Sequence, residues 1–262
     1  MNKTVKNILV RVSMLIGLAA FIALVVIAKI NRDASRVDKI KIGVDEWNGN
    51  FFVSKNQVLN LIQNQFEVKG KILSGKDLER IEKAVRVIPQ VKNSNAYTDD
   101  KGNLNIKIEQ RKPLMRVYNL LGQSFYVDEN GIKFPVTSTF AAKVPIVTGN
   151  LVEACDTTVK IHSEELIKIF NTIQTVNKNK LWQAMIGQYI INEKGQIELI
   201  PRFGNCTILF GDDKNIEQKI KRLDVFVKAS LERARANPFQ PLETTVVILG
   251  SGASVKPTLV KP

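Results

Sequence analysis

Apolar residues are spread unevenly along this chain, and their densest run lies near the N-terminus. The residues from Val12 to Ala28 include no charged side chain, and Arg11 and Lys29 stand on either side of them. A helix of this length extends over roughly 26 Å, and basic side chains at its ends can reach the interfaces of a hydrocarbon core about 30 Å thick. The pattern predicts a single transmembrane helix over residues 12–28, between a tail of residues 1–11 and a linker of residues 29–36.

The short tail before this run carries Lys3, Lys6 and Arg11 but no acidic residue. A basic tail favours the cytoplasmic side, which sends the C-terminal bulk of the chain outside. The alternative is a cleaved signal peptide, whose apolar region is shorter, about 7–15 residues. The length of the run favours a retained anchor. We therefore expect a single-pass protein of the inner (plasma) membrane, with its C-terminal domains in the periplasm.

Periodicity predicts a first domain over residues 37–110, with the order β-α-α-β-β. Ser54, in a capping box with Gln57, and Ser74 each precede a stretch with helical apolar spacing, and Pro89 ends the second stretch. Strict alternation predicts a half-buried sheet beside these helices. The expected strands cover residues 37–44, 91–97 and 104–108, and the expected helix residues of the core are Val58, Leu61, Leu78, Ile81 and Val85.

The composition changes at Arg111, and residues 111–250 are predicted to form a β-rich domain with two helices. The sequence Asp128-Glu129-Asn130-Gly131 is typical of a hairpin turn. Helical apolar spacing covers about residues 163–176 and about residues 215–234, and the second of these helices has a basic outer face. The fold class expected for the whole chain is α+β.

The end of the chain has a different composition. Residues Thr244–Leu249 predict a last strand, and residues 251–262 are rich in Gly, Ser and Pro. Segments of this kind at chain ends are commonly disordered, and we expect a disordered tail here.

Charge and cysteine content leave several alternatives open. The net charge is +13, which indicates either a solvated lysine-rich surface or attraction to anionic lipid headgroups or an acidic partner. Nucleic acid is not expected as a partner, because no binding motif is present and aromatic residues are sparse. Cys155 and Cys206 could form a disulfide in an oxidising compartment, or could remain two buried thiols.

The sequence lacks the marks of an enzyme of the cell wall. It contains no Ser-x-x-Lys and no His-Glu-x-x-His motif, and a single histidine, His162, excludes most zinc sites and catalytic triads. Gly250-Ser251-Gly252 is not a phosphate-binding loop, because no Lys-Ser/Thr follows it at the required spacing. We therefore expect no catalytic residue, no metal ligand, no cofactor and no small-molecule substrate.

Four local signatures, taken in order, resemble the FtsQ family of bacterial cell-division proteins, called DivIB in Gram-positive bacteria. The β-α-α-β-β order of residues 37–110 resembles a POTRA domain. The other three signatures resemble the family's interdomain junction, its hairpin and its strand-to-helix passage. They are Glu109-Gln110-Arg111-Lys112-Pro113, Tyr126-Val127-Asp128-Glu129-Asn130-Gly131, and Leu209-Phe210-Gly211-Asp212 followed by Ile220-Lys221-Arg222-Leu223.

The resemblance implies a non-enzymatic, membrane-anchored scaffold of the divisome. Such a protein links early and late division proteins through its periplasmic POTRA and β domains, and is found at the division septum. The implied partners are membrane proteins of the divisome, including coiled-coil proteins like FtsB and FtsL, and the lipid bilayer. The alternatives are a POTRA-type adaptor of another envelope assembly or secretion machine, and an anchored cell-wall enzyme.

The resemblance also implies a docking site, since the family binds FtsB on its last strand and the preceding helix. In this chain the strand lacks the charged and aromatic residues usual at its end. Strand addition relies on main-chain groups, so an uncovered last strand could still pair with a partner. The alternative is that the tail closes this edge, with Val246 and Ile248 in the core. The candidate partner-binding residues are Lys219, Arg222, Thr245, Val246, Val247, Ile248 and Leu249, with Lys228 as a further cation.

Overall fold

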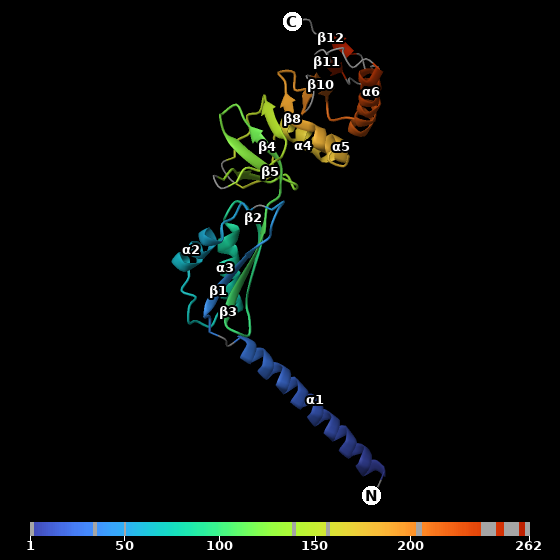
Figure 1. Ribbon diagram of the computed structural model, residues 1–262. Coiled ribbons are helices and arrows are strands. Elements are labelled where there is room, and N and C mark those ends of the chain that lie inside the picture. The colour runs from blue at the N-terminus through green and yellow to red at the C-terminus, as the bar shows by residue number, and fades with distance from the viewer. Residues whose placement is uncertain are drawn as a thin grey trace. The chain divides into compact units, whose positions relative to one another are not determined.

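The computed structural model describes two compact units, Met1–Gln110 and Arg111–Pro262, here called the first and the second unit (Figure 1). In its described part the chain is α+β, as the sequence predicted, with six helices and two sheets. The residues described are 3–33, 36–49, 51–137, 140–155, 158–202, 206–236, 245–248 and 257–259.

The N-terminal helix α1 covers Lys3–Asp33 and contains the apolar run that begins at Val12. Its side chains from residue 11 to residue 26 are exposed, whereas that of Ala28 lies outside the described residues. In the part of the chain that the structure describes, no helix combines the length and the hydropathy needed to cross a membrane. The transmembrane span over residues 12–28 stays a prediction.

The first unit has the β-α-α-β-β order expected from the periodicity. Its single sheet has the strand order β1-β3-β2, in which β1 is parallel and β2 antiparallel to the central strand β3. The two helices between β1 and β2 contact β1 and β2 respectively. The elements are β1 Lys39–Val44, α2 Lys55–Gln65, α3 Gly75–Arg86, β2 Val91–Thr98 and β3 Asn103–Gln110.

Helices α2 and α3 begin at the predicted serines, but only α3 has the predicted kind of cap. Ser74 and Asp77 form a reciprocal capping box at α3, in which each side chain accepts a hydrogen bond from the other residue's backbone N–H. Ser54 begins α2 without a side-chain cap, so the capping box predicted with Gln57 is wrong. The helix still forms because Val58 and Ile62 bury its inner face.

The core of the first unit lies between the helices and the inner face of the sheet. Val58, Ile81 and Val85 are fully buried, as predicted. Leu61 and Leu78 are only partly buried at the rim of this core, which corrects the prediction for both. Their helical spacing is right, but the three-stranded sheet is too narrow to cover the outer sides of the helices.

The second unit is built on a nine-stranded sheet in the order β12-β11-β10-β9-β8-β7-β4-β5-β6. Its strands are β4 Pro113–Tyr118, β5 Ser124–Asp128, β6 Lys133–Pro135, β7 Ile146–Gly149, β8 Ile186–Ile191, β9 Ile197–Pro201, β10 Cys206–Gly211, β11 Thr245–Ile248 and β12 Pro257–Leu259. Its helices are α4 Glu164–Val176, α5 Lys180–Met185 and α6 Ile216–Ala236.

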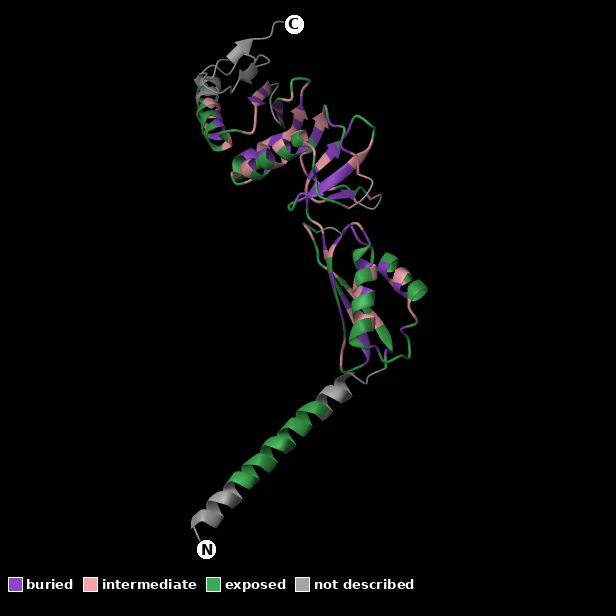
Figure 2. Cartoon of the chain, turned by 180° about the vertical axis from the view of Figure 1, so that it is seen from behind, coloured by how far each residue is buried: buried purple, intermediate pink, exposed green. Residues whose placement is uncertain are grey.

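Helix α4 lies against the sheet of the second unit and contacts α6, and the sides of these helices away from the core are exposed (Figure 2). Trp182 of α5 and Tyr189 of β8 are among the largest buried side chains of the core. Gly149 ends β7 at φ +107°, where an added Cβ would lie 2.0 Å from the backbone oxygen of Ile191 in β8. This close backbone approach requires glycine.

The C-terminal tail differs from the prediction. Its residues Pro257–Leu259 form β12, which pairs antiparallel with β11 in the register Thr245 to Leu259. The prediction that this part of the tail is disordered, and that no later strand covers the last predicted strand, is therefore wrong. An unpaired strand edge carries unsatisfied N–H and C=O groups, and the returning tail supplies partners for them.

Candidate partner-binding site

The predicted docking residues belong to one β-α-β passage at the end of the second unit. Strands β10 and β11 are parallel neighbours, with Cys206 opposite Thr245 and Ile208 opposite Val247, and α6 lies between them in the sequence. Strand β11 is enclosed by β10 on one side and by β12 on the other. Its four residues are described by their backbone, and Leu249 lies outside the described residues, as do the side chains of Val246 and Ile248.

The outer edge of this sheet is β12, not β11. It is three residues long and begins with Pro257, which has no N–H to donate. Short strands and prolines are features that weaken pairing at sheet edges. A partner strand that adds to β11 must therefore displace a short strand of the chain itself.

Lys219 is buried, although its helical position predicts an exposed basic face. Its Nζ donates to Oδ1 of Asp212 at 2.6 Å and to the backbone oxygen of the same residue at 2.7 Å. The ammonium group also lies 4.9 Å from the ring centre of Phe210. The hydrogen bond from Lys219 holds the pKa of Asp212 below its ordinary value. Lys219 fixes the passage from β10 to α6, and its assignment to an exposed basic face is wrong.

The other predicted cations lie on the surface. Arg222 and Lys228 are exposed on α6, whereas Leu223 between them is buried against the core. Asp224 on the same helix accepts a hydrogen bond from Nε1 of Trp182 at 2.6 Å, which ties α6 to α5. The helix therefore has one packed side and one basic side, and the basic side includes Arg222 but not Lys219.

A buried charge cluster in the second unit was not found from the sequence. Glu153 accepts hydrogen bonds from Nζ of Lys133 and from the backbone N–H of Ser163, and the ion pair with Lys133 spans 2.8 Å. His162 contributes its Nδ1 at 3.1 Å from the same carboxylate. Burial acts to raise the pKa of Glu153, but the hydrogen bonds from Lys133 and Ser163 outweigh it, and the pKa is lowered.

The Glu153 cluster fixes a loop, and its chemistry does not indicate catalysis. Lys133 also donates to the backbone oxygen of Ala154, so the pair holds the segment before α4 against β6. Among the described residues, no group of three or more His, Cys, Asp or Glu side chains could hold a metal ion. The side chain of Cys206 lies outside the described residues, so the choice between a disulfide with Cys155 and two separate thiols is not tested.

A comparison with known protein families gives a match that lies within the second unit. A family model described as FtsQ/DivIB, C-terminal related, matches residues 112–244, which is just over half of the 262 residues. The matched region begins just before β4 and includes α6. No curated protein matches the chain.

Proposed function

Since this chain belongs to the FtsQ/DivIB family, we propose that it is a non-enzymatic, membrane-anchored scaffold of the bacterial divisome. In this role it links early and late division proteins during septum formation. The observation that carries the proposal is the family match over residues 112–244. This match favours cell division over the alternative of an adaptor for another envelope assembly or secretion machine.

The proposed anchor is the apolar run Val12–Ala28, with the N-terminal tail in the cytoplasm and the domains of residues 37–110 and 111–250 in the periplasm. Between Val12 and Val26 the large apolar side chains of α1 are at least 46% exposed. Apolar surface of this extent is unfavourable in water and is normally covered by lipid or protein. Protease added to spheroplasts should digest the part of the chain that follows the anchor, and protection of that part would contradict this orientation.

Residues 37–110 of the first unit are proposed to be a POTRA domain, because they combine the β-α-α-β-β order with the sheet order β1-β3-β2. The second unit is proposed to bind a segment of a membrane-anchored coiled-coil protein of the FtsB or FtsL type. The partner segment would displace β12 and pair with the docking strand Thr245–Leu249. The exposed Arg222, and not Lys219, would attract acidic residues of that partner and raise the association rate.

The scaffold role is tested by imaging and by depletion. A fluorescent fusion of the full chain should gather at the division septum, and depletion of the protein should produce filamentous cells. A fusion that lacks residues 111–262 is the matched control and should lose the septal signal, because it lacks the region with the family match. Uniform envelope fluorescence of the full chain, with normal division after depletion, would contradict the proposal.

A further inference from the structure

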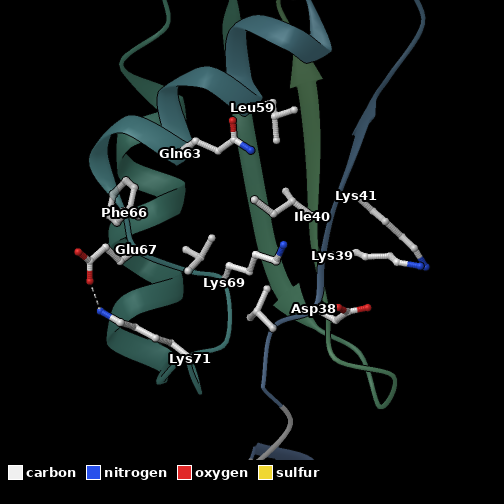
Figure 3. A pocket seen from close by; sticks show the side chains of 12 residues that line it. Asp38, Lys39, Ile40, Lys41, Leu59, Gln63, Phe66, Glu67, Lys69 and Lys71 are labelled. Carbon is white, nitrogen blue, oxygen red and sulfur yellow. Dashed lines mark hydrogen bonds and ion pairs between the residues drawn. The ribbon is translucent and has the colours of Figure 1, made fainter.

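The first unit contains a groove that the sequence did not predict. It has a volume of about 730 Å³ and lies between β1, α2 and the segment that follows α2 (Figure 3). Its apolar lining includes Ile40 of β1, Leu59 of α2, and Phe66, all of which are only partly buried. Figure 3 shows Ile40 and Leu59 directed into the space between the strand and the helix.

One wall of this groove is a strand edge that is open beyond its first residues. Strand β1 is the outermost strand of its sheet, and among the described strands it pairs with β3 alone. Val37, just before β1, is already hydrogen-bonded to the segment after α2. Its N–H donates to the backbone oxygen of Lys71 at 2.9 Å, and its backbone oxygen accepts from the N–H of Gly70 at 2.8 Å. Asp38 turns the other way and donates to Gly102 beside β3.

The hydrogen bonds to β3 show which residues of β1 face outward. Asp45 donates its N–H to Ile108 of β3 at 2.9 Å, and β1 keeps one register with β3 from Lys39 to Val44, so Lys41 and Gly43 also bond to β3. Ile40 and Ile42 therefore present their backbone N–H and C=O groups to the outer edge. The side chains of β1 alternate between exposed and partly buried, and Ile40 is on the side of the helices. A strand added at this edge would therefore direct every second side chain into the apolar groove.

The charged side chains around the groove indicate which kind of segment it binds. Four lysines line it, namely Lys39, Lys41, Lys69 and Lys71, against two acidic residues, Asp38 and Glu67. Glu67 pairs with Lys71 at 2.7 Å, and Lys41 lies 3.9 Å from Asp99, which leaves Lys39 and Lys69 against Asp38. The side chain of Lys69 extends over the groove in Figure 3. This excess of positive charge complements an acidic segment.

The same charge disfavours occupants from this protein itself. A second copy carries a net charge of +13, and residues 251–262 contain Lys256 and Lys261 but no acidic residue. We propose that the groove binds one extended acidic segment of a partner protein, which joins the sheet beside β1 as a fourth strand. The recognised pattern is apolar residues at alternate positions with acidic residues between them. This surface is separate from the docking strand of the second unit.

The test uses the purified full-length chain and a fluorescein-labelled peptide of about eight residues that alternates Val and Glu. Ile42→Pro removes an N–H that faces the outer edge, where proline is tolerated. Ile42→Ala is the matched control, since it also removes the isoleucine side chain but keeps the N–H. We expect the dissociation constant of Ile42→Pro to exceed that of Ile42→Ala about tenfold, the effect of one lost hydrogen bond.

A second pair of variants tests the charge. Lys69→Glu should weaken peptide binding, whereas Lys76→Glu, an equal change of charge on exposed α3 outside the groove, should leave it unchanged. Thermal melting of all four variants checks that each is folded. Equal affinities of folded Ile42→Pro and Ile42→Ala would overturn strand addition. Equal weakening by Lys69→Glu and Lys76→Glu would show charge attraction without a groove. Neither result bears on septal localisation, which tests the scaffold role separately.

Discussion

Arg111 donates a hydrogen bond from Nη1 to Oδ2 of Asp128 across 2.8 Å, and thereby joins two motifs that are separate in the sequence. Asp128 is fully buried, and its other oxygen accepts the backbone N–H groups of Asn130 and Ile132 in the hairpin turn. The first residue of the second unit is thus tied to the carboxylate that shapes the turn between β5 and β6. Arg111 of the junction motif and Asp128 of the hairpin motif therefore have a structural role together, which their spacing in the sequence did not reveal.

Loss of this pair should destabilise the second unit. Arg111→Ala removes a charged donor from a buried carboxylate, and we expect a loss of about 1.5–3 kcal/mol in the free energy of unfolding. Denaturant unfolding is followed by the fluorescence of Trp182, which lies in this unit, in a Trp47→Phe background. The exposed neighbour Lys112→Ala is the control and should change stability by less than about 0.5 kcal/mol. An unfolding midpoint of Arg111→Ala equal to that of the control would exclude a stabilising role for the pair.

Substitutions in the first unit should rank by burial. Ile81 is fully buried, so Ile81→Ala should cost about 2–5 kcal/mol through lost transfer free energy and a cavity. Leu78→Ala should cost less, because Leu78 is at the rim of the core. Val87, 77% exposed, supplies the control, and Val87→Ala should be nearly neutral. Far-UV circular dichroism in guanidinium gives the order, and a larger loss for Leu78→Ala than for Ile81→Ala would contradict the helix packing.

Acid should destabilise the second unit through Glu153. Its pKa is lower in the folded state than in the unfolded chain, where a glutamate titrates near ~4.3. Its contribution to stability is therefore fully present above that pH and is lost as the pH falls through the folded pKa. Glu153→Gln should flatten the fall in unfolding free energy below about pH 4.5.

The exposed Glu193→Gln is the matched control for this titration and should retain the wild-type slope. If Glu153→Gln and the wild type lose stability in parallel as the pH falls, the acid sensitivity arises elsewhere.

The docking strand of the second unit gives a prediction with two arms. Removal of residues 250–262 deletes β12 and leaves β11 as the outermost strand, so binding of the coiled-coil partner should be kept or strengthened. Val247→Pro removes a ladder donor from a strand paired on both sides and should weaken binding at least tenfold. Pull-down with a titrated partner measures both, and Trp182 fluorescence checks the fold. Wild-type binding by folded Val247→Pro would show that the docking site lies elsewhere.

The parts of the fold that follow local patterns could be predicted from the sequence. The β-α-α-β-β order rests on alternation and on helices opened by Ser54 and Ser74, which are signals within a few residues of each other. The six-residue helix α5 was not predicted, because Lys180–Met185 is too short to show helical periodicity. The cap that identifies it is Asn179, which accepts hydrogen bonds from the N–H groups of Leu181 and Trp182.

The parts that depend on distant contacts could not be predicted. Lys219 belongs to the basic face of α6 by its helical position, and only its contact with Asp212 and Phe210 buries it. The Lys133–Glu153 pair joins β6 to a loop, and no spacing rule relates two such residues. The tail was assigned to disorder from its composition, whereas the pairing of β12 depends on the open edge of β11.

The parallel pairing of β1 with β3 has a consequence for the order of events during synthesis. Lys39 pairs with Asn103, so the first strand of the unit to leave the ribosome finds its partner only when the last strand follows. The intervening helices can form on local contacts, but closing so long a loop costs entropy and is slow. Until then Ile40, Ile42 and Val44 have no sheet to pack in, so the unfinished chain exposes apolar side chains that the finished domain partly buries.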